Sequence, residues 1–431
     1  MRFSIFTPTH KADYLPEVFE SLKRQVFTDW EWVLIPNGGK IIIPESISSH
    51  PQVRIVEAPQ DIAKRGIGAL KLFACQQCHG DYFVEVDHDD LLTPDALQEM
   101  ENTAQATNAG FLYSDFANFY PDGTCQIFGE AYGWKHYPFE LDGKHYTAMR
   151  AFGTYPGSLQ QIYYAPNHVR AWSREAYFKA GGHDPALHVV DDHDLLCRTY
   201  LAGVEFAHIP KCLYLYRLQA GDQNSYLQMN DDIQVMQQEI ANKYIYRMVM
   251  EWANRQGHLL LDLGGSQPIE GFKTAGFPDA DFDWDCHKGI PLPDNSVGCI
   301  RAYDFLPHIA PCRGHQCNHG ANGENLCVVG MMNEFYRVLV PGGWLMTGTA
   351  STDGRGAFQD PTHQSYWNPN SFWYYTNQNY AKYVKGLTAR FQDTRLWQAF
   401  PTTWHEENKI PYVFADLVAI KGQELPGIIS I

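Results

Sequence analysis

The first half of the chain alternates between short apolar runs and amphipathic stretches. The pattern predicts strands for RFSIFTP (residues 2–8) and EWVLIPNGG (31–39), and an amphipathic helix for LPEVFESLKRQ (15–25). It predicts another helix for RGIGALKLFACQQC (65–78) and another strand for DYFVEVDHDD (81–90). Strands that alternate with helices are typical of a mostly parallel sheet, in which ligands bind at the carboxyl ends of the strands.

A long helical stretch divides the chain. It runs from Asp231 to Gln256 and ends before Gly257, after which the apolar run HLLLDLGGS begins. We therefore expect a first domain over 1–230, a connecting helix over 231–256 and a second domain over 257–431. The second half again alternates, in VGCIRAYDFL, MMNEFYRVLV, GGWLMTGTA and YVFADLVAIKG. Both halves therefore predict the α/β class, with two three-layer domains.

Composition narrows the possible functions. The 431 residues carry a formal net charge of −16, and 45% of them are hydrophobic. This charge argues against a general nucleic-acid binder, which would show a basic surface, but a local site could still hold a phosphate-bearing small molecule. The apolar runs are too short for a membrane span, and Pro8 and His10 interrupt the run that a signal peptide would need. With 10 cysteines and no secretion signal, the sequence predicts a cytoplasmic protein with mostly reduced thiols.

Three acids follow the strand that is predicted to end at Val86. Asp87 and Asp89 are two positions apart, so on an extended backbone their side chains would share one face. Carboxylates gathered in this way suit Mg²⁺ or Mn²⁺, which can also bind substrate phosphates. Alternatively, these acids are ordinary turn residues ahead of a helix that begins near Thr93. Other polar clusters follow strands in the same way, at Thr7-Pro8-Thr9 and Asn37-Gly38-Gly39.

The first domain resembles family 2 glycosyltransferases of the GT-A fold. The resemblance rests on FSIFTPTHKADYLPEVFESLKRQVFTDWEWVLIPNGG, DYFVEVDHDDLLTPDAL and GGHDPALHVVDDHDLLCRTYLAG, which come in the family's order. It implies that Asp87 and Asp89 hold a divalent cation, Mn²⁺ or Mg²⁺, on the diphosphate of a nucleotide sugar. It also implies that Thr7, Pro8 and Thr9 line the nucleotide pocket. Asn37 stands where the family commonly has an acid that contacts the base, so the identity of the nucleotide stays open.

A second acidic cluster, DDHDLLCR, begins at Asp191 and matches the family's acidic motif at the start of a helix. By this resemblance Asp192, or as second choice Asp191, is the general base that deprotonates an acceptor hydroxyl. A partly dry pocket can raise the proton affinity of such a carboxylate. Alternatively, aspartates at a helix N-terminus satisfy free amides and the helix dipole without any chemistry. Asp194 is expected to orient the helix or to face the core.

The segment ahead of this cluster predicts a strand on which His168, Arg170 and Trp172 share one face. Arg170 could contact a donor phosphate and Trp172 could stack on a sugar ring. Equally, Trp172 could be a core residue and Arg170 an ion-pair partner. Downstream, YLYRLQAGDQNS resembles the family's closing element, in which a histidine often stands at the position of Gln219. A third protein ligand for the cation therefore stays open.

The second half contains a strand, an acid and a glycine turn in HLLLDLGGS, where a cofactor could approach the backbone. With DCHKGIPLPDNSVGCIRAYDFLPHI and MMNEFYRVLVPGGWLMTGTA, it resembles class I S-adenosylmethionine-dependent methyltransferases. The resemblance implies a Rossmann-like sheet with an antiparallel last hairpin, for which TRLWQAF and YVFADLVAIKG are candidates. It implies cofactor contacts from Asp262, Gly264 and Gly265 at the methionine end, from Asp285 near the adenine, and from Tyr303 and Asp304 after the fourth strand.

The methyltransferase family usually places an acid at the end of its second strand, where it binds the ribose hydroxyls. Gly276 stands near that position in this chain, and Asp281 or Asp283 could replace the acid. Two interpretations follow for the second domain. It either transfers methyl groups, or it keeps the fold and serves as an acceptor-binding or scaffolding module.

Two further segments of the second half carry reactive side chains. FQDPTHQSYWNPNSFWYYT contains Asp360 and His363, which could form a methyl-acceptor site or belong to a packed loop. HIAPCRGHQCNHGANGENLC carries Cys312, His315, Cys317, His319 and Cys327. Such side chains bind zinc, although this spacing matches no common zinc pattern. One hypothesis is a structural zinc at Cys312, His315 and Cys317.

The preferred hypothesis is a two-domain transferase. The first domain would move a sugar from a nucleotide sugar to a glycan, lipid-linked or protein hydroxyl, by a single displacement with inversion at the sugar carbon. The second domain would methylate the same product. A second hypothesis makes the second domain catalytically inactive, and a third makes the whole chain a non-catalytic glycan- or nucleotide-binding protein. The two intact acidic pairs argue against the third hypothesis.

Overall fold

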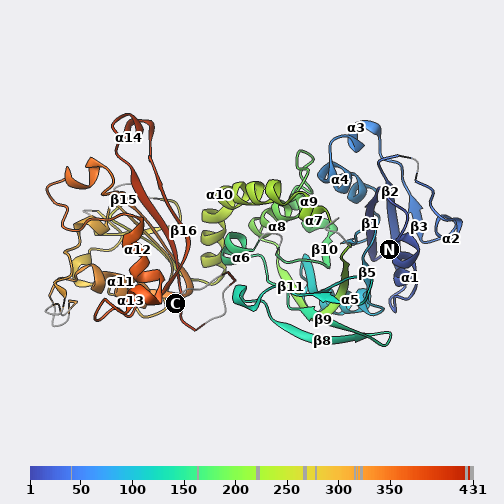
Figure 1. Ribbon diagram of the computed structural model, residues 1–431, viewed down its shortest axis with the longest axis horizontal. Coiled ribbons are helices and arrows are strands. Elements are labelled where there is room, and N and C mark those ends of the chain that lie inside the picture. The colour runs from blue at the N-terminus through green and yellow to red at the C-terminus, as the bar shows by residue number, and fades with distance from the viewer. Residues whose placement is uncertain are drawn as a thin grey trace. The chain divides into compact units, whose positions relative to one another are not determined.

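The computed structural model describes residues 1–39, 41–162, 165–219, 224–265, 269–276, 279–314, 317, 319–320, 324–422 and 426–427. The chain forms two compact units, Met1–Met248 and Val249–Ile431 (Figure 1). The division falls inside the long helix α10 (Asn230–Arg255), in the region where a connecting helix is expected. None of the helices among the described residues is long and apolar enough to cross a membrane.

The first unit is built on a mixed sheet of 11 strands. Its main path runs β3-β2-β1-β4-β10-β6-β11-β5, and β7, β8 and β9 extend the sheet beside β6. The strands are β1 (Phe3–Thr9), β2 (Trp30–Pro36), β3 (Val53–Ile55), β4 (Tyr82–Glu85), β5 (Leu91–Leu92), β6 (Phe111–Phe119), β7 (Cys125–Gln126), β8 (His136–Leu141), β9 (Lys144–Met149), β10 (Arg170–Ser173) and β11 (Phe206–Arg217). Strands β3, β2, β1 and β4 are parallel, as their alternation with helices predicts, whereas β10 is antiparallel to β4 and β6.

Helices cover both faces of this sheet. Residues of α1 and α5 pack on one face and residues of α4, α7 and α8 on the other, because neighbouring residues of β1 such as Ile5 and Phe6 point to opposite cores. The helices of the unit are α1 (Leu15–Lys23), α2 (Glu45–Ser48), α3 (Gln60–Ala63), α4 (Ile67–Gln77), α5 (Ala96–Thr107), α6 (Pro156–Gln161), α7 (Arg174–Lys179), α8 (Asp191–Leu201) and α9 (Ser225–Gln228), with the 3₁₀ turn η1 (Glu130–Tyr132). The α/β class is therefore confirmed, and the first unit has the three expected layers.

The second unit is built on a six-stranded sheet in the order β13-β12-β14-β15-β17-β16. The strands are β12 (Leu259–Leu263), β13 (Lys273–Ala275), β14 (Val297–Tyr303), β15 (Leu339–Ala350), β16 (Phe391–Ala399) and β17 (Tyr412–Ala419). The first four strands of this order are parallel, and β17 lies antiparallel between β15 and β16. The closing hairpin expected for TRLWQAF and YVFADLVAIKG is thus confirmed.

Helices are scarcer in the second unit. Apolar residues of α11 (Val328–Val338) and α12 (Pro369–Thr376) pack into a core with the sheet. The remaining helical segments are η2 (Cys286–Lys288), η3 (Leu306–His308), η6 (Arg355–Phe358), α13 (Gln378–Ala381) and α14 (Thr403–Glu407). The described residues between β12 and β14 contain no α-helix, so the expectation of three complete layers is not confirmed for this unit. The connection from Leu263 to Lys273 is shorter than the dozen or so residues that a helical crossover needs.

Candidate active site

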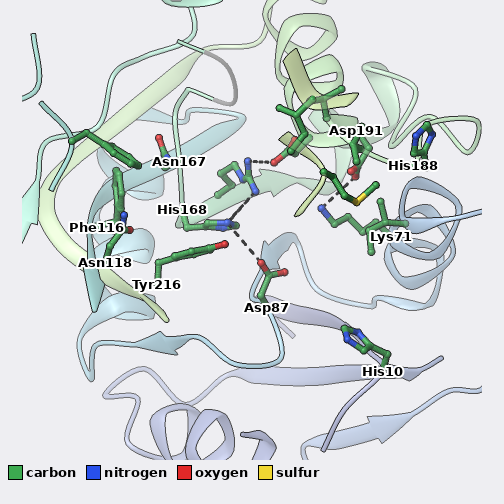
Figure 2. Close-up of a pocket in the computed structure, with 18 residues that line it drawn as sticks. His10, Lys71, Asp87, Phe116, Asn118, Asn167, His168, His188, Asp191 and Tyr216 are labelled. Carbon is green, nitrogen blue, oxygen red and sulfur yellow. Dashed lines mark hydrogen bonds and ion pairs between the residues drawn. The ribbon is translucent and has the colours of Figure 1, made fainter. Parts of the chain in front are cut away.

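A cavity of about 380 Å³ lies at the carboxyl end of β4 in the first unit. Its lining includes Lys71 of α4, Asp87 after β4, Arg170 of β10, and Asp191 and Asp192 at the start of α8 (Figure 2). The fold therefore brings together the two acidic clusters that lie a hundred residues apart in the sequence. Figure 2 shows Lys71 beside Asp191 and His168 pointing toward Asp87.

Lys71, Arg170 and the two aspartates of α8 line this cavity, and both cations contact Glu85, which is not among the lining residues. Lys71 Nζ lies 2.6 Å from Glu85 Oε1 and 3.3 Å from Asp191 Oδ2. Arg170 Nε lies 3.0 Å from Glu85 Oε2, and its Nη1 donates to Asp192 Oδ2 at 2.6 Å. Glu85 thus joins both cations, and each cation reaches one aspartate of α8. Because these side chains are largely removed from water, each charge depends on its partners.

Asp191 and Asp192 differ in proton affinity because their surroundings differ. Burial raises the pKa of Asp191 to about 6, with Asp192 and Glu85 adding to the shift and Lys71 opposing it. Burial acts in the same direction on Asp192, but Arg170 and Lys71 outweigh it and hold the pKa of Asp192 well below its usual range. Asp192 is therefore firmly ionised, while Asp191 titrates close to neutrality. The side chain of Asp192 is also the more exposed, at 17% against 5%.

The acidic turn after β4 is held in place by Asp90. This carboxylate is fully buried; its Oδ2 accepts from the Tyr214 hydroxyl at 2.7 Å and its Oδ1 accepts from the backbone N–H of Arg217 at 2.7 Å. The Tyr214 hydroxyl also accepts from the backbone N–H of Asp87 at 3.2 Å. Burial raises the pKa of Asp90 well above its usual range, helped by Asp89 and Asp87. Asp90 therefore fixes the turn on β11 and leaves Asp87 facing the cavity.

The residues present at this turn fit a divalent cation. Asp87, Asp90 and His168 offer one ligand atom each within 4.8 Å of one another, and the His168 ring stacks on Tyr214. Burial, together with Arg170, lowers the pKa of His168 to about 4, so its imidazole is neutral and able to act as a ligand. Asp89 Oδ2 instead accepts from Gln219 Nε2 at 2.9 Å, and Asp89 is not among the residues that line the cavity.

Several predicted site residues have other contacts. The Thr7 hydroxyl donates to the Val86 carbonyl at 2.7 Å and accepts from Trp32 Nε1 at 2.9 Å, and the Thr9 hydroxyl donates to the Lys11 carbonyl. None of Thr7, Pro8, Thr9 and Asn37 is among the lining residues of the cavity, whereas His10 is. Their assignment to the nucleotide pocket therefore stays a prediction.

Trp172 cannot stack on a sugar ring, because it is fully buried and donates to the Thr199 hydroxyl at 3.2 Å. The core alternative is thus correct for Trp172. Arg170 forms the ion pairs of the second alternative, and its contact with a donor phosphate stays a prediction. Asp194 is buried as expected, where it accepts from Arg198 Nε and from the Tyr244 hydroxyl, each at 2.7 Å.

Lys71 and Glu85 were missed by sequence reasoning. Each is a single charged residue inside an apolar run, in ALKLFAC and YFVEV respectively. A charge in such a position pays a large desolvation cost unless it is paired. The presence of two such charges of opposite sign, on a helix and on the strand that follows it, could have predicted this buried ion pair.

Comparison with known proteins supports the assignment of the first unit. Residues 4–156 match the family model for glycosyl transferase family 2. This match lies within the first unit and supports a family 2 glycosyltransferase domain there. The chain is 25% identical over 318 residues to hyaluronan synthase of Pasteurella multocida, covering 71% of this chain and 29% of that protein. It is 25% identical over 217 residues to chondroitin synthase of Escherichia coli, covering 49% of this chain and 28% of that protein.

The chain spans less than a third of the length of either of these relatives. Among solved structures, residues 1–349 of S. aureus TarS align over 59% of this chain and 70% of that chain, with 15% identity and a TM-score of 0.42. That structural likeness is weak, so the α/β architecture of the first unit rests on its own strand order.

A second cavity, of about 680 Å³, lies in the second unit. Its lining includes Gly264, Gly265, Asp285, Tyr303 and Asp304, which are residues expected around a cofactor. Gly264 has a φ of +82°, and a Cβ there would come 3.2 Å from Phe305 Cβ. A side chain at this turn would therefore be strained and would crowd the cavity.

The acid at the glycine turn is already partnered. Asp262 is fully buried, and its Oδ1 accepts from Arg301 Nη1 at 2.9 Å. Its Oδ2 has no hydrogen-bond partner among the described residues and lies against Gly265, where a Cβ would come within 2.0 Å of it. Burial raises the pKa of Asp262, and Arg301 opposes this shift. Arg301 thus compensates much of the negative charge of Asp262, which was expected to contact the methionine end of S-adenosylmethionine.

Among the described residues, no carboxylate at the end of β13 lines this cavity. Gly276 follows Ala275 directly, as the sequence suggests, and lines the cavity. Asp281 accepts from the backbone N–H of Thr274 at 3.0 Å and pairs with Lys273 at 2.7 Å. Neither Asp281 nor Asp283 is among the lining residues, so the structure does not support either as the replacement.

The possible methyl-acceptor residues lie beside this cavity. Asp360 and His363 offer ligand atoms within 4.8 Å of each other and of His308, which lines the cavity. His363 Nδ1 is 2.9 Å from the Ala357 carbonyl, and Asp360 Oδ1 accepts from the backbone N–H of Thr362 at 2.7 Å. The structure therefore gathers the two predicted residues with one that was not predicted.

Proposed function

We propose that this protein is a metal-dependent glycosyltransferase that moves a sugar from a nucleotide sugar to a hydroxyl of a glycan, lipid-linked or protein acceptor. The observation that carries the proposal is the cavity in which Asp87 faces Asp191, Asp192 and Arg170, within a family 2 glycosyltransferase domain. The printed names of the relatives, a hyaluronan synthase and a chondroitin synthase, favour a glycan as acceptor. The ten free cysteines favour a reducing compartment such as the cytoplasm.

The donor would bind with its diphosphate at Asp87. A divalent cation, Mn²⁺ or Mg²⁺, would be held by Asp87 with Asp89 or His168, and would neutralise charge on the departing diphosphate. The protein's own contribution is to hold Asp87 toward the cavity through the bonds of Asp90 and Tyr214 described above. The ion pair between Arg170 and Glu85 would hold the guanidinium in a fixed position beside the donor.

Asp192 would act as the general base. The acceptor oxygen forms a bond to the anomeric carbon while the bond from that carbon to the diphosphate oxygen breaks, and Asp192 takes the hydroxyl proton. A single displacement of this kind inverts the configuration at the carbon. Asp192 suits the role because it is ionised and the more exposed of the two aspartates. Its low proton affinity means that proton transfer has to come late, once the acceptor oxygen has lost electron density to the sugar.

The test is the release of nucleoside diphosphate from a panel of nucleotide sugars with Mn²⁺ and glycan acceptors. Asp192→Asn should lower turnover by roughly two to four orders of magnitude and leave donor affinity nearly unchanged. The matched control is Asp81→Asn, an exposed aspartate of the same unit, which should keep full turnover. Near-normal turnover in Asp192→Asn would transfer the role to Asp191 or elsewhere.

For the second unit, several groups that would bind S-adenosylmethionine are not found among the described residues. Asp262 is paired with Arg301, no acid follows β13, and the described residues after the glycine turn form no helix whose free amides could hold a carboxylate. We therefore propose that this unit keeps a methyltransferase-like strand order and serves as an acceptor-binding or scaffolding module. The hypothesis that the chain also methylates its product is set aside on these observations.

A further inference from the structure

Three cysteines and one histidine converge in the segment between η3 and α11. The side chains of Cys312, Cys317, His319 and Cys327 place one ligand atom each within 4.8 Å of all the others. The zinc hypothesis from the sequence combined Cys312 and Cys317 with His315, which lies outside the described residues. The histidine that the fold brings to the cysteines is His319, and Cys327 completes a set of four.

The spacing of these atoms is that of ligands around one ion. His319 Nδ1 lies 3.3 Å from Cys327 Sγ and 3.9 Å from Cys312 Sγ. In tetrahedral zinc sites, Zn–S bonds of about 2.3 Å and Zn–N bonds of about 2.0–2.1 Å separate a sulfur from a nitrogen ligand by about 3.5 Å. The two observed distances lie on either side of that value.

Two glycines make room for the histidine. A Cβ on Gly386 would come 2.3 Å from His319 Nε2, and a Cβ on Gly330 of α11 would come 2.3 Å from the His319 carbonyl oxygen. The ring is thus packed against the backbone on its Nε2 side, and its Nδ1 faces the sulfurs. A histidine held in this orientation by close backbone contact is preorganised as a ligand.

The cluster lies where a bound ion would link two segments of the second unit, the one after η3 and the start of α11. Cys327 is buried and directly precedes α11, and the backbone N–H of Val328 donates to the Ala310 carbonyl at 2.9 Å. Cys312 lies two residues beyond Ala310. An ion bound by all four side chains would therefore join the segment that leaves the second cavity to the first turn of α11.

We propose that Cys312, Cys317, His319 and Cys327 form a structural zinc site. Three thiolates and one imidazole select zinc among the common divalent ions, and a complete set of four protein ligands leaves no open position for catalysis. The role is to hold the long connection between β14 and α11. This site does not depend on the function proposed for either cavity.

The first measurement is the metal content of the full chain, purified under reducing conditions, by elemental analysis. One zinc per chain is expected, and X-ray absorption at the zinc edge should show three sulfur neighbours and one nitrogen neighbour. Cys317→Ser should lose the zinc and unfold at a lower temperature. His319→Cys should keep one zinc with four sulfur neighbours, because the change replaces one ligand by another.

Two controls locate the ion. His363→Ala removes a member of the His308, Asp360 and His363 cluster and should keep the zinc; zinc lost in this variant would assign the ion to that cluster and overturn the proposal. Cys125→Ser, at a cysteine of the first unit, should also keep it. If Cys317→Ser does not fold, the wild type and His319→Cys still decide. A wild-type protein without zinc, or with a disulfide between two of the three cysteines under reducing conditions, would contradict the site.

Discussion

Replacing Lys71 by methionine removes the cation that two buried carboxylates share. Methionine fills a similar volume and keeps the apolar stem, so the change isolates the charge. Glu85 and Asp191 then lie in the core without the ammonium group that contacts them at 2.6 and 3.3 Å. Their side chains are only 2% and 5% exposed, so water cannot replace the lost partner.

The expected loss in the free energy of unfolding is large. Removing one partner of a buried ion pair typically costs about 3–5 kcal/mol, because the remaining charge is left uncompensated. For a unit of this size, that loss corresponds to a fall of roughly 6–20 °C in the unfolding temperature. The loss should be greater at pH 8 than at pH 5. Without Lys71 the pKa of Asp191 rises further above about 6, so at low pH the carboxyl is protonated and costs little, whereas at high pH it must be buried as an anion.

Thermal unfolding followed by circular dichroism at the two pH values measures both effects. The matched control is Lys211→Met, since Lys211 also contacts two carboxylates, those of Asp95 and Glu99, but its side chain is 46% exposed. An exposed pair is worth about 0–1 kcal/mol, so this control should barely change the unfolding temperature at either pH. Equal losses in the two variants, or a loss in Lys71→Met that does not depend on pH, would refute the reasoning.

Other predictions concern the two cavities. Transfer activity should fall as the pH is lowered through about 6, because Asp191 takes up a proton there and the ion network loses a negative charge. Asp191→Asn should already have the low activity at pH 7 and lose this pH dependence; a wild-type midpoint far from 6 would contradict the assignment. In the second unit, calorimetric titration of the full chain with S-adenosylmethionine should give no heat at millimolar cofactor. Micromolar binding that Gly264→Val abolishes would instead restore the methyltransferase hypothesis.

The elements that the sequence predicts well are those that a local pattern of apolar residues specifies. The apolar runs of β1, β2, β12 and β14 were recognisable because a buried strand needs such a run, and glycines follow β2 and β12. The antiparallel hairpin of β16 and β17 was recognisable through the resemblance to methyltransferases. The described residues between β12 and β13 form no helix, and the number of residues in this short connection could have predicted that.

The contacts within the sites were harder to predict, because they join residues that are far apart in the chain. Asp87 and Asp192 were found because each stands in a dense acidic motif. The partner of Asp192, Arg170, was named, but its contact with Glu85 depends on the pairing of β10 with β4 in antiparallel register, which no local pattern reveals. For the same reason the proposed zinc ligand His319 could not be singled out from the sequence, because its place beside Gly386 and the cysteines depends on contacts between distant residues.

Donor binding tests the central claim most directly. The full chain is titrated with a panel of nucleotide sugars, with and without Mn²⁺, and its thermal stability is recorded; a bound ligand stabilises the native state. At least one nucleotide sugar should raise the unfolding temperature only when Mn²⁺ is present. Asp87→Ala should abolish that rise, and Asp122→Ala, at an exposed turn outside the cavity, should keep it. A wild-type chain that no nucleotide sugar stabilises, or an Asp87→Ala variant stabilised as much as the wild type, would contradict the glycosyltransferase site described above.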